Sequence, residues 1–147
     1  MEIFKSIGEE KKCMLGETLS SFEYLPGKVF LIKEGNARLI SRIDNKPTSV
    51  AKLSKGDFIG IAPLLSGKPI EEVIASKNLV VYCIKDQEFL ELYKTRSSIR
   101  NFCDNNTWAS EILFILKTFP KLHKKNLFIS TNLLDEVSDK ADLIGSN

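Results

Sequence analysis

The feature that most constrains the fold is a succession of short apolar or alternating runs, separated by turn-forming residues about every 8 to 12 positions. The runs lie between about residues 20 and 85 of this 147-residue chain, and the strands expected among them include the alternating ARLISRI (37–43), FIGIAPLL (58–65) and LVVYCIK (79–85). Pro26-Gly27, Gly35-Asn36 and the segment 54–57 have the composition of turns, and Gly35-Asn36 predicts a tight hairpin. This rhythm is typical of an all-β sandwich or barrel.

Helical patterns are expected on both sides of the strand-rich region. Residues 9–19 predict a weak helix, and Asp86 is expected to be the N-cap of a helix that begins the segment 86–119. A further short helix is expected at about 132–144. The clearest helical stripe lies in 107–119 and consists of Trp108, Ile112, Ile115, Leu116 and Phe119, widened by Leu113 and Phe114.

The stripe has two readings. Core packing is the first, because a helix that packs on a domain needs an apolar face about 100° wide. Leu113 and Phe114 extend the face beyond that width and are the candidate interface residues, for contact with another domain of the same polypeptide or in a homodimer.

Composition excludes several classes of protein. The formal net charge of +2 gives no electrostatic argument for binding nucleic acid or an anionic membrane. No apolar run approaches the roughly 20 residues of a membrane span, so this segment is not expected to insert into a bilayer. No secretory signal is visible at the start, and three cysteines without a CxxC spacing indicate reduced thiols in a cytoplasmic protein.

No catalytic, metal or cofactor site is predicted. The single histidine, His123, has no cysteine or aspartate neighbours, so it is not expected to bind metal. Nothing resembles a nucleophile with its base, so the domain is not expected to be an enzyme, although a full-length protein could carry an ATPase elsewhere.

The run FLIKEGNARLI, then LSKGDFIG (53–60) and SGKP (66–69), resembles the cyclic-nucleotide-binding domains of catabolite activators and kinase regulatory subunits. The resemblance covers about residues 22–95. It implies an α+β, mainly β fold: an eight-stranded jelly roll (double-stranded β-helix) at about 20–85 with helices before and after it. The domain is then expected to comprise 1–122, and 123–147 a tail or linker. Here Phe30 follows Pro26-Gly27 almost at once, so either a strand pair is missing or this is not the family's Pro-Gly.

The ligand-binding segment of the resembled family contains two polar residues that hold the nucleotide, here called the polar anchors, and this chain lacks both. The family's Gly-Glu pair appears as Gly60-Ile61, followed by Ala62, and its Pro-Arg pair as Pro69-Ile70. The resemblance implies that the missing Glu would bind the ribose and the missing Arg the cyclic phosphate. Binding of cyclic AMP or cyclic GMP is therefore not expected.

Glu71-Glu72 follow directly and complete the candidate vestigial pocket. They are interpreted as a solvated strand start, with an acidic recognition surface as the alternative. Gly56, Gly60 and Gly67 are interpreted as turn glycines rather than as surviving ligand contacts.

Three functions remain. The first is a regulatory or docking domain that has lost its nucleotide; the alternatives are a small-ligand sensor with an apolar pocket and, more weakly, the effector domain of a transcription regulator. The run from Leu53 to Glu71 also resembles the degenerate domains at the N-terminus of cyanobacterial toxin-secretion ABC exporters. That resemblance implies that the chain is the cytoplasmic N-terminal part of such a transporter.

Overall fold

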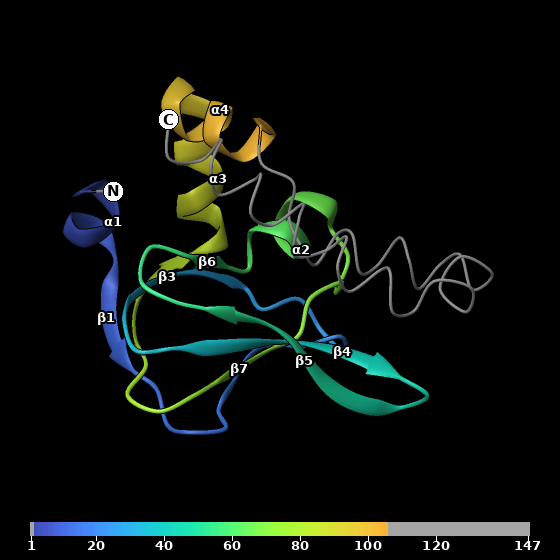
Figure 1. Ribbon diagram of the computed structural model, residues 1–147. Helices are drawn as coiled ribbons and strands as arrows, with labels where there is room; N and C mark the ends of the chain where they lie inside the picture. Colours follow the sequence, from blue (N-terminus) through green and yellow to red (C-terminus); the bar gives the residue numbers. More distant parts are fainter. Residues whose placement is uncertain (1, 106–147) are drawn as a thin grey trace.

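The computed structural model describes residues 2–105, in which strands form the middle and helices lie at both ends (Figure 1). In chain order the elements are α1 (Glu2–Ile7), β1 (Glu9–Lys12), β2 (Thr18–Ser20), β3 (Lys28–Glu34), β4 (Ala37–Ile43), β5 (Lys46–Leu53), β6 (Phe58–Ile59), α2 (Ile61–Ser66), β7 (Val73–Ala75), β8 (Val80–Lys85), α3 (Asp86–Thr95) and α4 (Ser97–Asn105).

The strands form two antiparallel four-stranded sheets, in the orders β1-β8-β3-β6 and β2-β7-β4-β5. The chain passes repeatedly from one sheet to the other: β3 pairs with β6 and β8, whereas β4, the next strand, pairs with β5 and β7. Two four-stranded sheets connected in this way make a jelly roll. The expected mainly β fold with flanking helices is confirmed.

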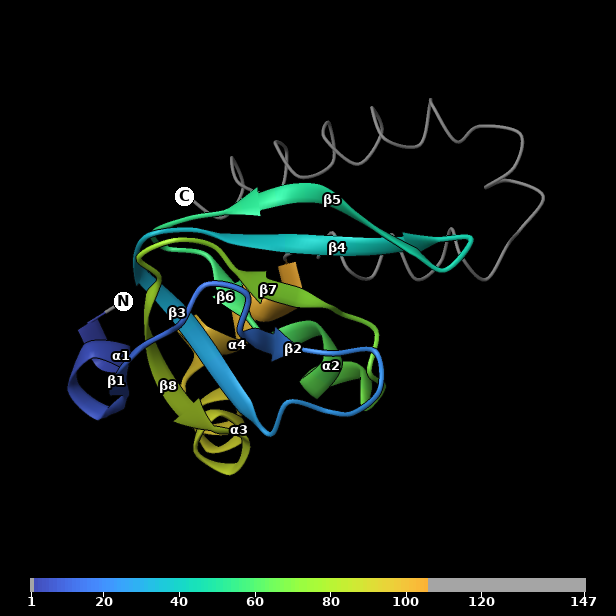
Figure 2. The ribbon, with the colours of Figure 1, turned by 90° about the horizontal axis from the view of Figure 1, so that it is seen from below.

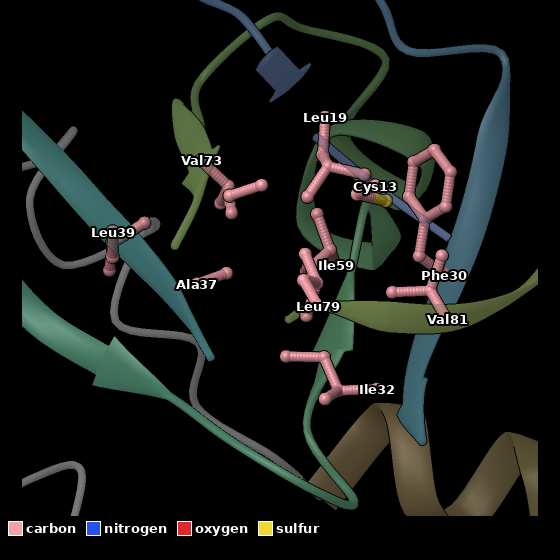
Figure 3. Close-up of a cluster of buried hydrophobic side chains, with 11 residues drawn as sticks. Cys13, Leu19, Phe30, Ile32, Ala37, Leu39, Ile59, Val73, Leu79 and Val81 are labelled. Atoms are coloured by element: carbon pink, nitrogen blue, oxygen red, sulfur yellow. The ribbon is translucent and has the colours of Figure 1, made fainter. Parts of the chain in front are cut away.

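One hydrophobic core lies between the two sheets, where side chains from both point toward one another (Figure 3). A second core lies between the outer face of the β1-β8-β3-β6 sheet and the helices α1, α2, α3 and α4 (Figure 1). Strand β3 contributes to both, because Phe30 and Ile32 face the first core while Val29 and Leu31 face the second. Burial on both faces explains why VFLI is a continuous apolar run.

The N-terminal part of the roll differs from the sequence prediction. The helix expected at 9–19 is wrong, since Glu9–Lys12 pairs with β8 and Thr18–Ser20 pairs with β7. The roll therefore begins at Glu9 rather than at about residue 20, and β1 and β2 complete eight strands within residues 2–105. The four charged side chains of β1 are all exposed, so the strand has no apolar pattern in the sequence. Only its pairing with β8 defines it as a strand.

The hairpin predicted at Gly35-Asn36 is also wrong. The turn connects β3 to β4, which lie in different sheets. Gly35 has a φ of 80°, and a Cβ atom there would lie 2.1 Å from the carbonyl oxygen of Asn78. The glycine therefore permits close contact with the β7–β8 turn rather than a two-stranded ribbon.

Helical segments depart from expectation at two places. The run 58–65 was expected to be a strand, but only Phe58–Ile59 pairs with β3, and α2 follows from Ile61. Asp86 is the first residue of α3 instead of its N-cap, and no side chain caps this helix.

The predicted helices beyond α4 cannot be compared with the structure. Helices α3 and α4 occupy the described part of the segment 86–119. The stripe at 107–119 with Leu113 and Phe114, the helix at 132–144 and the boundary at 122 lie outside the described residues. Within residues 2–105, no helix has the length and hydropathy needed to cross a membrane.

Candidate functional site

The candidate site is the segment from Gly60 to Glu72, which contains α2 and leads into β7. Gly60 adopts a left-handed conformation with a φ of 97° at the N-cap of α2. A Cβ atom at this position would lie 2.5 Å from the carbonyl oxygen of Lys28, so only glycine fits. Gly56 and Gly67 also have positive φ values, of 93° and 70°, in agreement with the reading of all three as turn glycines.

Ile61 and Ala62 anchor the start of α2. Each is 1% exposed, and Ile61 belongs to the second core, together with Val29 and Phe89. The side chain at the position that the sequence resemblance assigns to the ribose-binding glutamate therefore packs beneath the helices. A glutamate in the same rotamer would bury an unpaired charge, which is why isoleucine suits this geometry.

Pro69 and Ile70 lie in the segment that connects α2 to β7. Pro69 is exposed, whereas Ile70 is only 4% exposed. The amide of Ile70 donates a hydrogen bond to the carbonyl oxygen of Lys68 over 2.9 Å, which tightens the turn. The position that the sequence resemblance assigns to the phosphate-binding arginine thus holds a buried aliphatic side chain.

Glu71 turns back to the beginning of α2. Its Oε1 accepts a hydrogen bond from the backbone N–H of Gly60 over 2.9 Å, in a buried setting. Gly60 is the N-cap of α2, and negative charge is favoured at the amino end of a helix. The chain's own carboxylate therefore occupies a position that an anionic ligand would need in order to accept from the same donor.

Glu72 forms a two-pronged ion pair with Arg42 of β4. Arg42 Nε donates to Glu72 Oε2 over 3.1 Å, and Arg42 Nη2 donates to Glu72 Oε1 over 3.0 Å. The Glu72 side chain is 9% exposed and that of Arg42 is 41% exposed. The nearby carboxylate raises the pKa of the Arg42 guanidinium above its ordinary value. The geometry is the planar fork that only arginine provides.

Backbone contacts fix the same two residues. The hydroxyl of Ser20 donates to the carbonyl oxygen of Glu71 over 3.1 Å, and the amide of Ile40 donates to that of Glu72 over 2.9 Å. Glu71 and Glu72 are each 7% exposed. The reading of this pair as a solvated strand start is therefore wrong, and the alternative of an acidic recognition surface fails for the same reason.

The three cysteines within the described part of the chain are all free thiols. Burial raises the pKa of the Cys13 and Cys103 thiols to about 11, so neither is a ready nucleophile. Burial also raises the pKa of the half-buried Cys83 thiol. Among residues 2–105, no group of three or more histidine, cysteine, aspartate or glutamate side chains is placed to hold a metal ion.

Sequence reasoning missed Arg42 and Ser20, which hold the acidic pair in place. Both lie far from Glu71 in the chain, and they approach it because β2 and β4 flank β7. No local pattern carries this information; only the strand order does.

The described residues thus form a jelly roll flanked by helices, with a short helix that follows Gly60 between β6 and β7. The family model for the cyclic nucleotide-binding domain matches residues 10–96. The chain belongs to this family. Among the curated proteins, none matches the chain.

Solved structures of similar fold include kinase regulatory subunits and a catabolite activator protein. The regulatory domain of Toxoplasma gondii PKA, crystallised with cAMP, is 21% identical, with a TM-score of 0.58; the match covers 65% of this chain and 37% of that one. The regulatory subunit of a cAMP-independent protein kinase A from Trypanosoma brucei is 18% identical, with a TM-score of 0.54, covering 58% and 32%.

The Thermus thermophilus catabolite activator protein is 16% identical, with a TM-score of 0.58, and the match covers 91% of this chain and 58% of that one. At these identities the comparisons show the fold. The chain spans less than two thirds of the length of each of these three proteins.

Proposed function

We propose that this chain is a non-catalytic regulatory domain whose cyclic-nucleotide pocket is closed by its own side chains, and which acts through contacts with other protein. The observation that carries the proposal is the hydrogen bond from the Gly60 N–H to the Glu71 carboxylate. A cyclic phosphate that approached this donor would meet an existing negative charge. At about 4 Å, the repulsion is on the order of 4 kcal/mol for an effective dielectric constant near 20.

Two further features support a closed pocket. Ile61 and Ile70 replace the two polar anchors and are themselves buried, so neither position offers a donor or acceptor to a nucleotide. Glu72 is already paired with Arg42, and this arginine is therefore committed to a carboxylate instead of a phosphate. A fold of this kind without cAMP dependence has a counterpart in the Trypanosoma brucei subunit described as cAMP-independent.

The protein contacts are proposed to be with the rest of a longer polypeptide or with a second copy, through the apolar residues Leu113 and Phe114. The resemblance of Leu53 to Glu71 to the amino-terminal domains of toxin-secretion ABC exporters suggests the longer polypeptide, with this domain in the cytoplasm. The test is the reading frame beyond Asn147. Hydrophobic spans and a Gly-x-x-x-x-Gly-Lys-Ser/Thr loop support the exporter context; a stop codon at that point contradicts it.

Titration calorimetry tests the closed pocket. Cyclic AMP, cyclic GMP and guanosine are each titrated into the 147-residue chain, and no binding is expected for any of them. The Toxoplasma gondii domain crystallised with cAMP serves as the positive control.

Micromolar or tighter binding of either cyclic nucleotide overturns the proposal. Guanosine is included because a related Trypanosoma cruzi subunit is described as bound to it. Binding of guanosine alone also overturns a closed pocket and establishes the alternative function, a sensor for an uncharged small ligand.

A further inference from the structure

A row of four residues crosses the outer face of the β2-β7-β4-β5 sheet. Ile74 of β7 lies opposite Thr18 of β2 on one side and opposite Arg38 of β4 on the other, and Arg38 lies opposite Lys52 of β5. Directly opposed residues of antiparallel strands share one face of the sheet. The neighbouring Leu39 faces the core between the sheets, so this row faces outward.

The row ends in two positive charges that have no carboxylate partner among residues 2–105. Arg38 and Lys52 are both exposed, and none of the ion pairs in the described part of the chain includes either of them. Like charges directly opposed across two strands destabilise a sheet. Arg42, further along β4, shows that an arginine of this strand binds a carboxylate in the two-pronged manner when one is within reach.

The row also lies where a partner can approach. Strand β5 is the edge strand of its sheet and lies outside β4, at the margin of the described fold (Figure 2). Ile74, next to Arg38, is half-buried and provides an apolar surface beside the two charges. The combination suits a short acidic segment with apolar residues in it.

The chain itself contains such a segment. Residues 135–142, DEVSDKAD, hold four carboxylates and one lysine, with Leu133 and Leu134 before them and Leu143 and Ile144 after them. Residues 106–134 connect α4 to this segment. Even with 107–119 helical at about 1.5 Å per residue and the other residues extended at about 3.3 Å per residue, the connection can reach any face of a domain this size. A tethered partner also has an effective concentration in the millimolar range, which lets a weak electrostatic contact form.

We propose that the acidic segment 135–142 binds within the same chain to the basic row formed by Ile74, Arg38 and Lys52. The carboxylates neutralise the opposed cations, and the flanking leucines pack against Ile74. The contact is independent of the pocket, so it stands or falls separately from the function proposed above.

Zero-length cross-linking with a carbodiimide tests the proposal on the 147-residue chain. This reagent joins a lysine amine to a carboxylate only when the two are in contact. Mass spectrometry is expected to find Lys52 joined to a carboxylate of 135–142, and the yield is expected to fall several-fold between about 0.1 M and 1 M salt, because screening shortens the Debye length from about 10 Å to 3 Å. Lys94 of α3, exposed on another element, is the internal control.

Equal yields at Lys52 and Lys94 overturn the proposal, as does the absence of a Lys52 product. Mixing isotope-labelled and unlabelled chains separates the possible sources of the carboxylate. A mixed product means that a second copy supplies the segment, which overturns an intrachain contact.

Charge reversal adds a second measurement. Arg38→Glu keeps Lys52 available but places a repelling charge beside it, so the Lys52 product is expected to fall several-fold. Lys94→Glu changes the net charge by the same amount and is expected to leave the yield unchanged. If Arg38→Glu fails to fold, Arg38→Gln replaces it, with a smaller fall expected; an unchanged yield in the folded variant overturns the proposal.

Discussion

Glu71 is a buried carboxylate whose acceptor role can be separated from its charge. Glu71→Gln keeps an oxygen within reach of the Gly60 N–H, whereas Glu71→Met fills a similar volume without an acceptor. A buried donor without a partner costs about 1–3 kcal/mol. We therefore expect the free energy of unfolding, measured in urea, to be lower for Glu71→Met than for Glu71→Gln by about this amount. Equal values would mean that the hydrogen bond is not what holds the segment to α2.

Asp86 makes stability depend on pH. Its Oδ1 is buried and has no hydrogen-bond partner within the described residues, and burial raises the pKa of the carboxyl above its ordinary value of 3.8. The folded protein then holds this proton more tightly than the unfolded chain does. The contribution to stability falls as pH rises from the unfolded-state pKa through the folded-state pKa, and it stays reduced above both.

Asp86→Asn removes this titration. We expect its free energy of unfolding, relative to the original chain, to increase with pH across that window and then to level off. Urea unfolding between about pH 4 and 7 measures the difference. Glu88→Gln, in the first turn of the same helix, controls for the loss of a charge near the helix N-terminus. A pH-independent difference for Asp86→Asn would refute the assignment.

At the scale of elements, the junction between β6 and α2 depends on a single glycine. Gly60 and Gly56 have nearly the same φ, 97° and 93°, but a Cβ atom at Gly60 would lie 2.5 Å from a backbone oxygen, whereas one at Gly56 would meet nothing within 4 Å. Gly56→Ala therefore carries only the conformational cost of the left-handed region, about 1–2 kcal/mol. Gly60→Ala adds a clash with Lys28 that only a backbone shift can relieve.

We expect Gly60→Ala to lower the free energy of unfolding by at least about 2 kcal/mol more than Gly56→Ala does, because steric overlap with the backbone is among the most destabilising effects of a single substitution. Denaturant unfolding of the two alanine variants side by side provides the comparison. Matching losses would show that the backbone at Lys28, the first residue of β3, shifts easily and that α2 is not fixed by this contact.

The elements that the sequence predicted are those whose burial leaves a local pattern. The strands at 37–43 and 80–85 alternate or are continuously apolar, and they were recognised. The charged edge strand Glu9–Lys12 left no such pattern, and α2 was mistaken for a strand because a six-residue apolar helix has no distinguishing period.

The same limit applies to the candidate site. The assignment of Ile61 and Ile70 to the positions of the two polar anchors rests on the resemblance alone, and the structure adds that both side chains are buried. The pairing of Glu72 with Arg42 could not be read from the sequence, since it depends on β4 lying beside β7.

At the scale of the whole molecule, the two hydrophobic cores share one sheet. Phe30 and Ile32 of β3 pack between the sheets, whereas Val29 and Leu31 of the same strand pack beneath the helices with Phe89 of α3. A strand that loses one core therefore loses part of the support for the other. Residues 2–105 are expected to unfold as a single cooperative unit.

Phe89→Ala tests this coupling from the helical side. Phe89 is 1% exposed, and removing a buried phenyl ring costs about 3–5 kcal/mol. We expect amide hydrogen exchange to accelerate in β7, which contacts only the core between the sheets, by the same factor as in α3. Tyr93 lies on the same helix as Phe89, and Tyr93→Phe, which removes one exposed hydrogen bond to Asp104 of α4, is the control; it should change the free energy of opening in both elements by less than about 0.5 kcal/mol. If Phe89→Ala accelerates exchange in α3 and leaves β7 protected, the helices open separately from the roll, and the prediction of a single cooperative unit is wrong. The reason is that β3 cannot release Val29 and Leu31 from one core while Phe30 and Ile32 remain fixed in the other, so unfolding through β3 would expose both α3 and β7.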